Sequence, residues 1–92
     1  MSTTQNHVST YTFVAENNDV IQDIIRTENF NDGRKIESVD RYINQRFISV
    51  TITEFLNGYK NGYQRINKEN GNGTSQNFTN YYINGVLQNN HM

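Results

Sequence analysis

The chain has 92 residues, a formal net charge of −1 and no cysteine. A chain of this length is expected to form one small domain over residues 1–92. The absence of cysteine excludes disulfides, thiolate nucleophiles and Cys-based zinc sites, and no apolar run is long enough to span a membrane. Hydrophobic residues make up only 34% of the chain. This predicts a thin core, either that of a small monomer or one completed against a second copy or a partner.

The first predicted element is a strand over His7–Glu16. Its residues alternate, with Val8, Thr10 and Val14 on one side of the chain. Its content of threonine, valine and aromatic residues favours the same structure. Residues 1–6 are expected to form a loose tail.

The segment Asp19–Glu28 fits either a short helix or a strand. Ile21, Ile24 and Ile25 lie on one helical stripe, and Asp19 can cap the first turn. Against this, most residues of the segment 20–27 are β-branched, which favours a strand. We predict a second short helix here and keep the strand as the alternative.

Three arrangements fit Arg34–Arg46. The segment could be a polar edge strand, a helix that begins at Ser38, or the first strand of a hairpin about Asn44-Gln45. The hairpin would put two charged residues on the core face. The unfavourable pairs would be Glu37 with Ile52 and Arg41 with Ile48.

The hydrophobic period changes from two to 3.6 near Thr53. Phe47–Thr53 alternates in the manner of a half-buried strand. The following large side chains recur at helical spacing, namely Phe55, Tyr59, Tyr63 and Ile66. Because Thr53 can act as an N-cap and Glu54 complements the helix dipole, we predict the main amphipathic helix over Thr53–Lys68.

The last third of the chain predicts a loop and a short strand. Residues 67–77 contain no apolar side chain and are expected to form a flexible loop. Phe78–Leu87 holds the remaining strand signal, with a tight turn at Asn84-Gly85, and residues 88–92 form a loose tail. The predicted fold is therefore α+β, a small antiparallel sheet packed against the Thr53–Lys68 helix.

Five residues are predicted to contact a partner. Gly58 and Gly62 would lie side by side on the predicted helix, where small residues permit close approach to the domain's own sheet or to a partner. Phe30, in a polar turn, and Tyr81 and Tyr82, beside a turn, are candidate aromatic anchors. The predicted function is a non-enzymatic protein–protein interaction module that forms a homodimer or joins a complex.

A nucleic-acid-associated protein is the alternative. Residues 34–68 carry seven basic and three acidic residues, whereas residues 1–33 carry one basic and five acidic residues. The two halves could also neutralise each other across the fold, and the pI of about 6.0 is low for a nucleic-acid-binding domain. The residues predicted for this alternative are Arg41, Arg46, Lys60, Gln64, Arg65 and Lys68.

No motif indicates catalysis. His7 and His91 lie near the chain ends, where neither is expected to be held as a rigid base. We predict no enzyme activity, no cofactor, no metal site and no small-molecule substrate. The sixteen asparagines point to an AT-rich genome, and a phage or mobile-element protein that blocks a host protein fits this composition. The lack of a signal peptide predicts a cytoplasmic location, in the host cytoplasm if the protein is phage-encoded.

Overall fold

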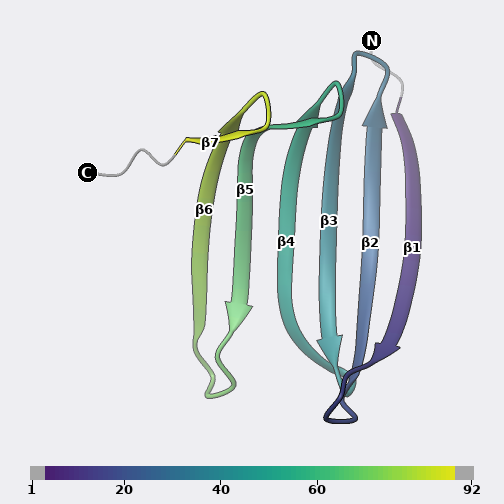
Figure 1. Cartoon of the computed structure of the whole chain (residues 1–92), viewed down its shortest axis with the longest axis vertical. Coiled ribbons are helices and arrows are strands. Elements are labelled where there is room, and N and C mark those ends of the chain that lie inside the picture. The colour runs from purple at the N-terminus through teal and green to yellow at the C-terminus, as the bar shows by residue number, and fades with distance from the viewer. Residues whose placement is uncertain (1–3, 89–92) are drawn as a thin grey trace.

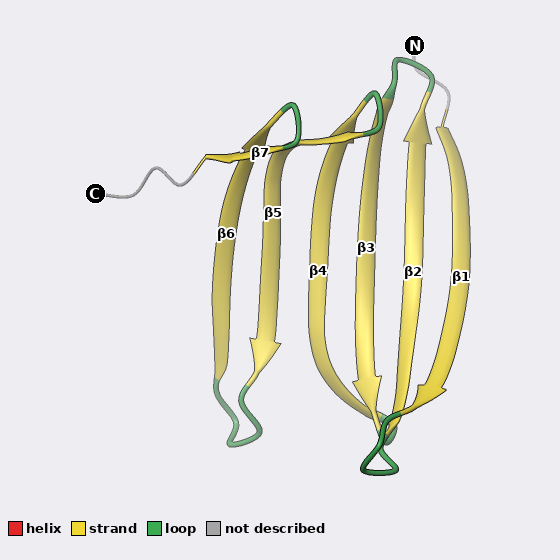
Figure 2. Ribbon diagram, viewed as in Figure 1, coloured by secondary structure: helices red, strands yellow, loops and turns green. Residues whose placement is uncertain are grey.

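The computed structural model describes residues 4–88 as a single sheet of seven antiparallel strands. The strands lie in chain order across the sheet, and each pairs with the next (Figure 1). Their bounds are β1 Thr4–Val14, β2 Val20–Phe30, β3 Arg34–Ile43, β4 Arg46–Leu56, β5 Tyr59–Glu69, β6 Ser75–Ile83 and β7 Val86–Gln88. Residues 4–88 contain strands, turns and loops and no helix (Figure 2). The predicted α+β fold is therefore wrong, and the fold is all-β.

The predicted helix Thr53–Lys68 is in fact a β-hairpin. β4 runs through Thr53 to Leu56, and β5 begins at Tyr59. The two residues between them, Asn57 and Gly58, have φ angles of +51° and +89°. Positive φ at both positions defines a type I′ turn, whose twist matches the flanking strands. A glycine inside the apparent helix was the sign that the helical spacing was accidental.

The predicted helix Asp19–Glu28 is also wrong, because this segment forms β2 and the turn before it. The β-branched residues decided the structure here, as the alternative interpretation expected. β2 pairs with β1 on one side and with β3 on the other. Within residues 4–88, no helix is long and apolar enough to cross a membrane.

The segment Arg34–Arg46 adopts the hairpin arrangement about Asn44-Gln45. A bulge in the β3–β4 pairing removes the conflict expected for it. The register shifts between Arg41 and Tyr42, so that Arg41 lies opposite Ser49 rather than Ile48. The same one-residue shift places Glu37 opposite Thr53 rather than Ile52. One extra residue in a strand thus places both of these charged residues opposite hydroxyl side chains.

Turns at the two ends of the sheet are bonded to their neighbours. The Asn44 N–H donates to the Val20 carbonyl oxygen at 2.8 Å, and the Asn57 N–H donates to the Gly33 carbonyl oxygen at 2.8 Å. The Asn44 side-chain oxygen accepts the Val20 N–H at 2.9 Å. Adjacent hairpins are therefore joined by their turns as well as by their strands.

The remaining strand and turn predictions agree in part with the structure. The predicted strands His7–Glu16 and Phe47–Thr53 lie mainly in β1 and β4, and Asn84-Gly85 forms the β6–β7 turn. The polar segment 67–77 lies mostly in strands, since β5 continues to Glu69 and β6 begins at Ser75. Residues 4–6 and Gln88, predicted as tails, belong to β1 and β7, and the other tail residues lie outside the described residues.

The sheet has two faces, which we name after the neighbours Thr53 and Ile52 in β4. Residues directly opposite each other in antiparallel strands share a face, so the register assigns every strand residue to one of them. The Thr53 face carries an apolar row across the sheet, formed by Ile25, Val39, Ile66 and Phe78 with Ser9 and Thr51. The adjacent row on this face is polar and consists of His7, Thr27, Glu37, Thr53, Gln64 and Asn80.

No apolar side chain is buried among the described residues. Only Thr53, at 4% exposure, is buried, and its Oγ1 accepts a hydrogen bond from Gln64 Nε2 at 3.1 Å. The Gln64 side-chain oxygen in turn accepts a hydrogen bond from Asn80 Nδ2 at 3.2 Å. The most buried residue of the described sheet therefore belongs to a polar, hydrogen-bonded ladder.

Candidate functional site

The five residues predicted to contact a partner do not form one surface. Gly58 lies in the β4–β5 turn, Gly62 within β5 and Phe30 at the end of β2. Tyr81 and Tyr82 are consecutive in β6 and therefore point to opposite faces. The glycines have φ angles of +89° and +103°, which no right-handed helix uses. The helical glycine ridge does not exist, and contact of any of these residues with a partner stays a prediction.

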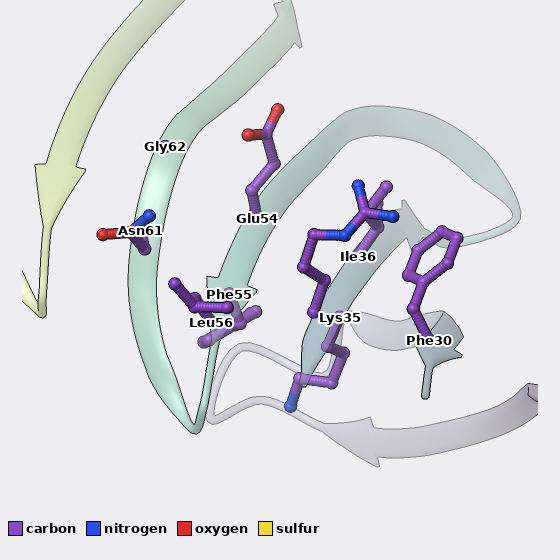
Figure 3. A pocket seen from close by; sticks show the side chains of 9 residues that line it. Phe30, Lys35, Ile36, Glu54, Phe55, Leu56, Asn61 and Gly62 are labelled. Atoms are coloured by element: carbon purple, nitrogen blue, oxygen red, sulfur yellow. The ribbon is translucent and has the colours of Figure 1, made fainter. Parts of the chain in front are cut away.

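Phe30 lines a pocket of about 300 Å³ near the β2–β3 and β4–β5 turns. Its walls on the Ile52 face include Ile36, Glu54 and Leu56, which come from β3 and β4 (Figure 3). The Arg34 guanidinium carbon lies 4.5 Å from the centroid of the Phe30 ring. Apolar walls with one carboxylate, one guanidinium and the Lys35 ammonium can hold a side chain of a partner, but this lining holds no pair of nucleophile and base.

The residues predicted for nucleic-acid binding are divided between the two faces. Five of them share the Thr53 face by the strand register, namely Arg41, Arg46, Lys60, Gln64 and Lys68. Arg65 lies on the Ile52 face opposite Ile52, and Arg46 donates to the Gly71 carbonyl oxygen at 3.3 Å. Among the cations of this set on the Thr53 face, Arg41 is bound to Asp23 and Arg46 to the Gly71 carbonyl oxygen, which leaves Lys60 and Lys68.

A row of alternating cations and aromatic rings crosses the end of the Thr53 face. Lys35 Nζ lies 4.3 Å from the centroid of the Phe55 ring, and Lys60 Nζ lies 5.0 Å from that of Tyr82. Phe55 is the direct cross-strand partner of both lysines. The sequence alone does not reveal this row, because its members come from four strands and only the pairing register brings them together.

The two faces differ in charge. The strand residues of the Thr53 face comprise five basic and two acidic side chains, which gives a formal charge of +3. The basic residues are Lys35, Arg41, Arg46, Lys60 and Lys68, and the acidic ones are Asp23 and Glu37. On the Ile52 face, three basic residues meet four acidic residues, and the turns add three acidic residues. The excess of basic residues in the segment 34–68 thus lies on the Thr53 face, whereas most acidic residues of the segment 1–33 lie in the turns.

The first edge of the sheet is an unprotected strand. β1 is 11 residues long and contains no proline, Asp, Glu, Lys or Arg. Natural edge strands are commonly blunted by lysine, proline or a bulge, and the β1–β2 register contains no shift. β6 is also uncharged, but the short strand β7 covers its end from Tyr81 to Ile83.

The backbone groups of β1 that lack a partner can be assigned from the β1–β2 hairpin. The Ala15 N–H donates to the Asp19 carbonyl oxygen at 2.9 Å, so odd-numbered residues of β1 bond to β2. Val20 lies opposite Val14 but bonds to Asn44 instead: its N–H donates to the Asn44 side-chain oxygen, and its carbonyl oxygen accepts the Asn44 N–H. The outward residues are therefore the even-numbered ones, including Asn6, Val8, Thr10, Thr12 and Val14.

The features of the sheet that bear on function are its two half-exposed faces and its β1 edge. Comparison of the chain with protein-family models, with curated proteins and with solved structures finds no match.

Proposed function

We propose that this protein is a non-enzymatic protein–protein interaction module that associates with a second copy of itself or within a complex. The observation that carries the proposal is the absence of any buried apolar side chain among residues 4–88. A sheet normally buries at least one face against another layer. Here both faces keep large side chains exposed, for example Phe13 and Phe78, each 47% exposed, on the Thr53 face.

The exposed apolar residues also occur on the Ile52 face. Tyr63 and Tyr81 are cross-strand partners with ring centroids 4.9 Å apart, and both side chains stay more than 40% exposed. Large exposed apolar patches on soluble proteins mark interaction sites. Association would remove this surface from water at about 25 cal/mol per Å² of apolar area, before the costs of association are subtracted.

Light scattering coupled to size exclusion, from low to high micromolar concentration, tests the proposal. We expect dimers or larger assemblies whose population rises with concentration. The same series should show cooperative unfolding with a midpoint that rises with protein concentration, because assembly stabilises only the folded chain. A cooperatively folded monomer at every concentration would remove the self-associating form of the proposal. The blocking of a host protein remains a separate prediction, which needs an identified partner.

Nucleic-acid binding is a second candidate, favoured by the cation–aromatic row of Lys35, Phe55, Lys60 and Tyr82. Single-stranded nucleic acids are bound by basic grooves with aromatic rings on which bases stack. The Thr53 face supplies the net positive charge and the rings, although the chain as a whole is acidic.

Titration of single-stranded DNA and RNA at two salt concentrations tests this second candidate. Phosphate contacts predict an affinity that falls steeply with salt, with a slope that drops by about 0.7 when Lys60 is replaced by Ala. Replacing Arg65, which lies on the opposite face, is the matched control and should leave the slope unchanged. Equal effects of the two substitutions, or no binding at low salt, would retire this candidate.

A further inference from the structure

We infer that β1 is the self-association site and pairs antiparallel with β1 of a second copy about a two-fold axis. The inference rests on the proposed function and names the surface that would perform it. The two sheets would become one continuous sheet, with the Thr53 faces of both copies on the same side. The partner in this case is the β1 strand of a second copy, which is recognised mainly through its backbone.

The outward backbone groups of β1 permit only some of the pairing registers between β1 strands of two copies. Outward residues must face outward residues, so even-numbered residues of one copy pair with even-numbered residues of the other. Full overlap of Thr4–Val14 with itself places the two-fold axis at Ser9, the midpoint of the strand. Val8 then lies opposite Thr10 of the second copy, and each such pair exchanges two hydrogen bonds.

The side chains of β1 are compatible with a second copy on both faces. A two-fold axis brings each residue close to its own counterpart, so any fixed charge near the axis would meet a like charge. β1 contains no Asp, Glu, Lys or Arg. About Ser9, the Ile52 face pairs Val8 with Thr10, and the Thr53 face pairs His7 with Tyr11. β-branched and aromatic pairs of this kind favour sheet formation.

The competing arrangement is head-to-tail pairing of β1 with β6, the other uncharged edge. Such a contact is heterologous and generates open chains of molecules rather than a closed dimer. β7 blocks part of that edge by pairing with Tyr81–Ile83. Among residues 4–88, β1 pairs only with β2, so its other edge is open along its whole length. This difference favours the two-fold arrangement.

Two matched Thr→Pro substitutions test the inference. Thr10→Pro removes an outward N–H of β1, and Thr79→Pro removes an outward N–H of β6. The Asn70 N–H donates to the Thr74 carbonyl oxygen at 3.0 Å, which assigns even-numbered residues of β6 to the β5 ladder and leaves Thr79 outward. Proline is tolerated where the missing N–H has no partner within the sheet. Far-UV circular dichroism and the urea midpoint verify that each variant folds.

We expect Thr10→Pro to raise the dimer dissociation constant at least about tenfold. In a two-fold dimer the substitution removes the N–H donor of residue 10 from both copies, so two hydrogen bonds are lost. Thr79→Pro should leave this constant within about twofold of the unmodified protein. If both substitutions weaken self-association equally, the contact is head-to-tail pairing of β1 with β6 and not the two-fold dimer. If the protein associates and neither substitution matters, β1 is not the site while the proposed function stands. A monomer at every concentration removes self-association itself.

A pair of Ser→Cys variants gives a measurement that does not depend on proline. The chain has no cysteine, so each variant carries a single thiol. Residues at the axis in a non-hydrogen-bonded pair have Cα atoms about 4.5 Å apart, within reach of a disulfide. Ser9→Cys should form a covalent dimer under mild oxidation, whereas Ser75→Cys on β6 should not. Crosslinking of Ser75→Cys as fast as that of Ser9→Cys would contradict the two-fold pairing at Ser9.

Discussion

Arg41 and Asp23 are direct cross-strand partners on the Thr53 face and form a bidentate ion pair. Arg41 Nε and Nη2 each lie 2.8 Å from a different carboxylate oxygen of Asp23. The Asp23 side chain is only 14% exposed, while that of Arg41 is 43% exposed. The hydrogen bonds from Arg41 lower the pKa of the Asp23 carboxyl below its ordinary value, against the opposing effect of partial burial. The bulge in the β3–β4 pairing helps this pair by placing Ser49 opposite Arg41.

The first prediction is that stability falls at acidic pH because of Asp23. A carboxyl whose pKa is lower in the folded than in the unfolded chain stabilises the fold above its unfolded pKa, about 3.9. That contribution is lost as the pH falls through the folded pKa. The free energy of unfolding should therefore drop as the pH falls below about 4, and Asp23→Asn should make this drop shallower. Urea unfolding at a series of pH values measures it.

Asp32→Asn is the control for this pH series. The backbone N–H and the guanidinium of Arg34 lower the pKa of Asp32 in the same direction, but this carboxyl belongs to an exposed turn. Solvent screening makes its contribution smaller. A larger reduction of the acid-dependent stability in Asp32→Asn than in Asp23→Asn would show that the turn, and not the cross-strand pair, carries the effect.

The strand and turn signals in the sequence were more informative than its helical spacing. Asn57-Gly58 and Asn84-Gly85 are the strongest hairpin dipeptides. The four-residue spacing of Phe55, Tyr59 and Tyr63 imitates a helix around the first of these dipeptides. In the sheet, Phe55 is on the Thr53 face and the two tyrosines are on the Ile52 face. Local periodicity cannot show which residues face each other across strands, and it is this pairing that determines the fold.

The second prediction concerns the strained residue in the Asn44-Gln45 turn. Gln45 has a φ angle of +69°, a left-handed conformation that costs a non-glycine residue about 1–2 kcal/mol. The equivalent position in the Asn57-Gly58 turn is glycine. We expect Gln45→Gly to stabilise the protein by about 1 kcal/mol, after the extra entropy lost by glycine on folding. The shift of the urea midpoint at fixed protein concentration measures it.

Gly58→Gln is the reciprocal variant for this turn. A Cβ added at Gly58 meets no atom within 4 Å, so its effect reports the backbone conformation alone. It should destabilise the protein by about 1 kcal/mol. If both substitutions destabilise, the Asn44-Gln45 turn relies on a contact of the Gln45 side chain, and that contact outweighs the backbone strain.

The features of the candidate sites could be predicted from the sequence only where they depend on residues close together in the chain. The charge division between the two halves of the chain was visible, and the pairing of β2–β5 turned it into the net positive charge of the Thr53 face. The row of Lys35, Phe55, Lys60 and Tyr82 was not visible, because it depends on three cross-strand registers at once. A bulge changes such registers by one residue, as it does at Arg41, and no sequence signal located that bulge.

The last prediction concerns the polar ladder of Thr53, Gln64 and Asn80, which contains the most buried residue of the described sheet. Thr53→Val keeps the shape and β propensity of the side chain but removes the acceptor of the Gln64 Nε2 hydrogen bond. Leaving that donor without a protein partner should lower the free energy of unfolding by about 1 kcal/mol. Thr51→Val is the matched control, on the same strand and face but in the apolar row between Val39 and Ile66. It should be neutral or stabilise the protein by up to about 0.5 kcal/mol through better cross-strand packing. If Thr53→Val is as stable as the unmodified protein in urea, the ladder contributes nothing that apolar contacts cannot replace, and Thr53 is buried by packing alone.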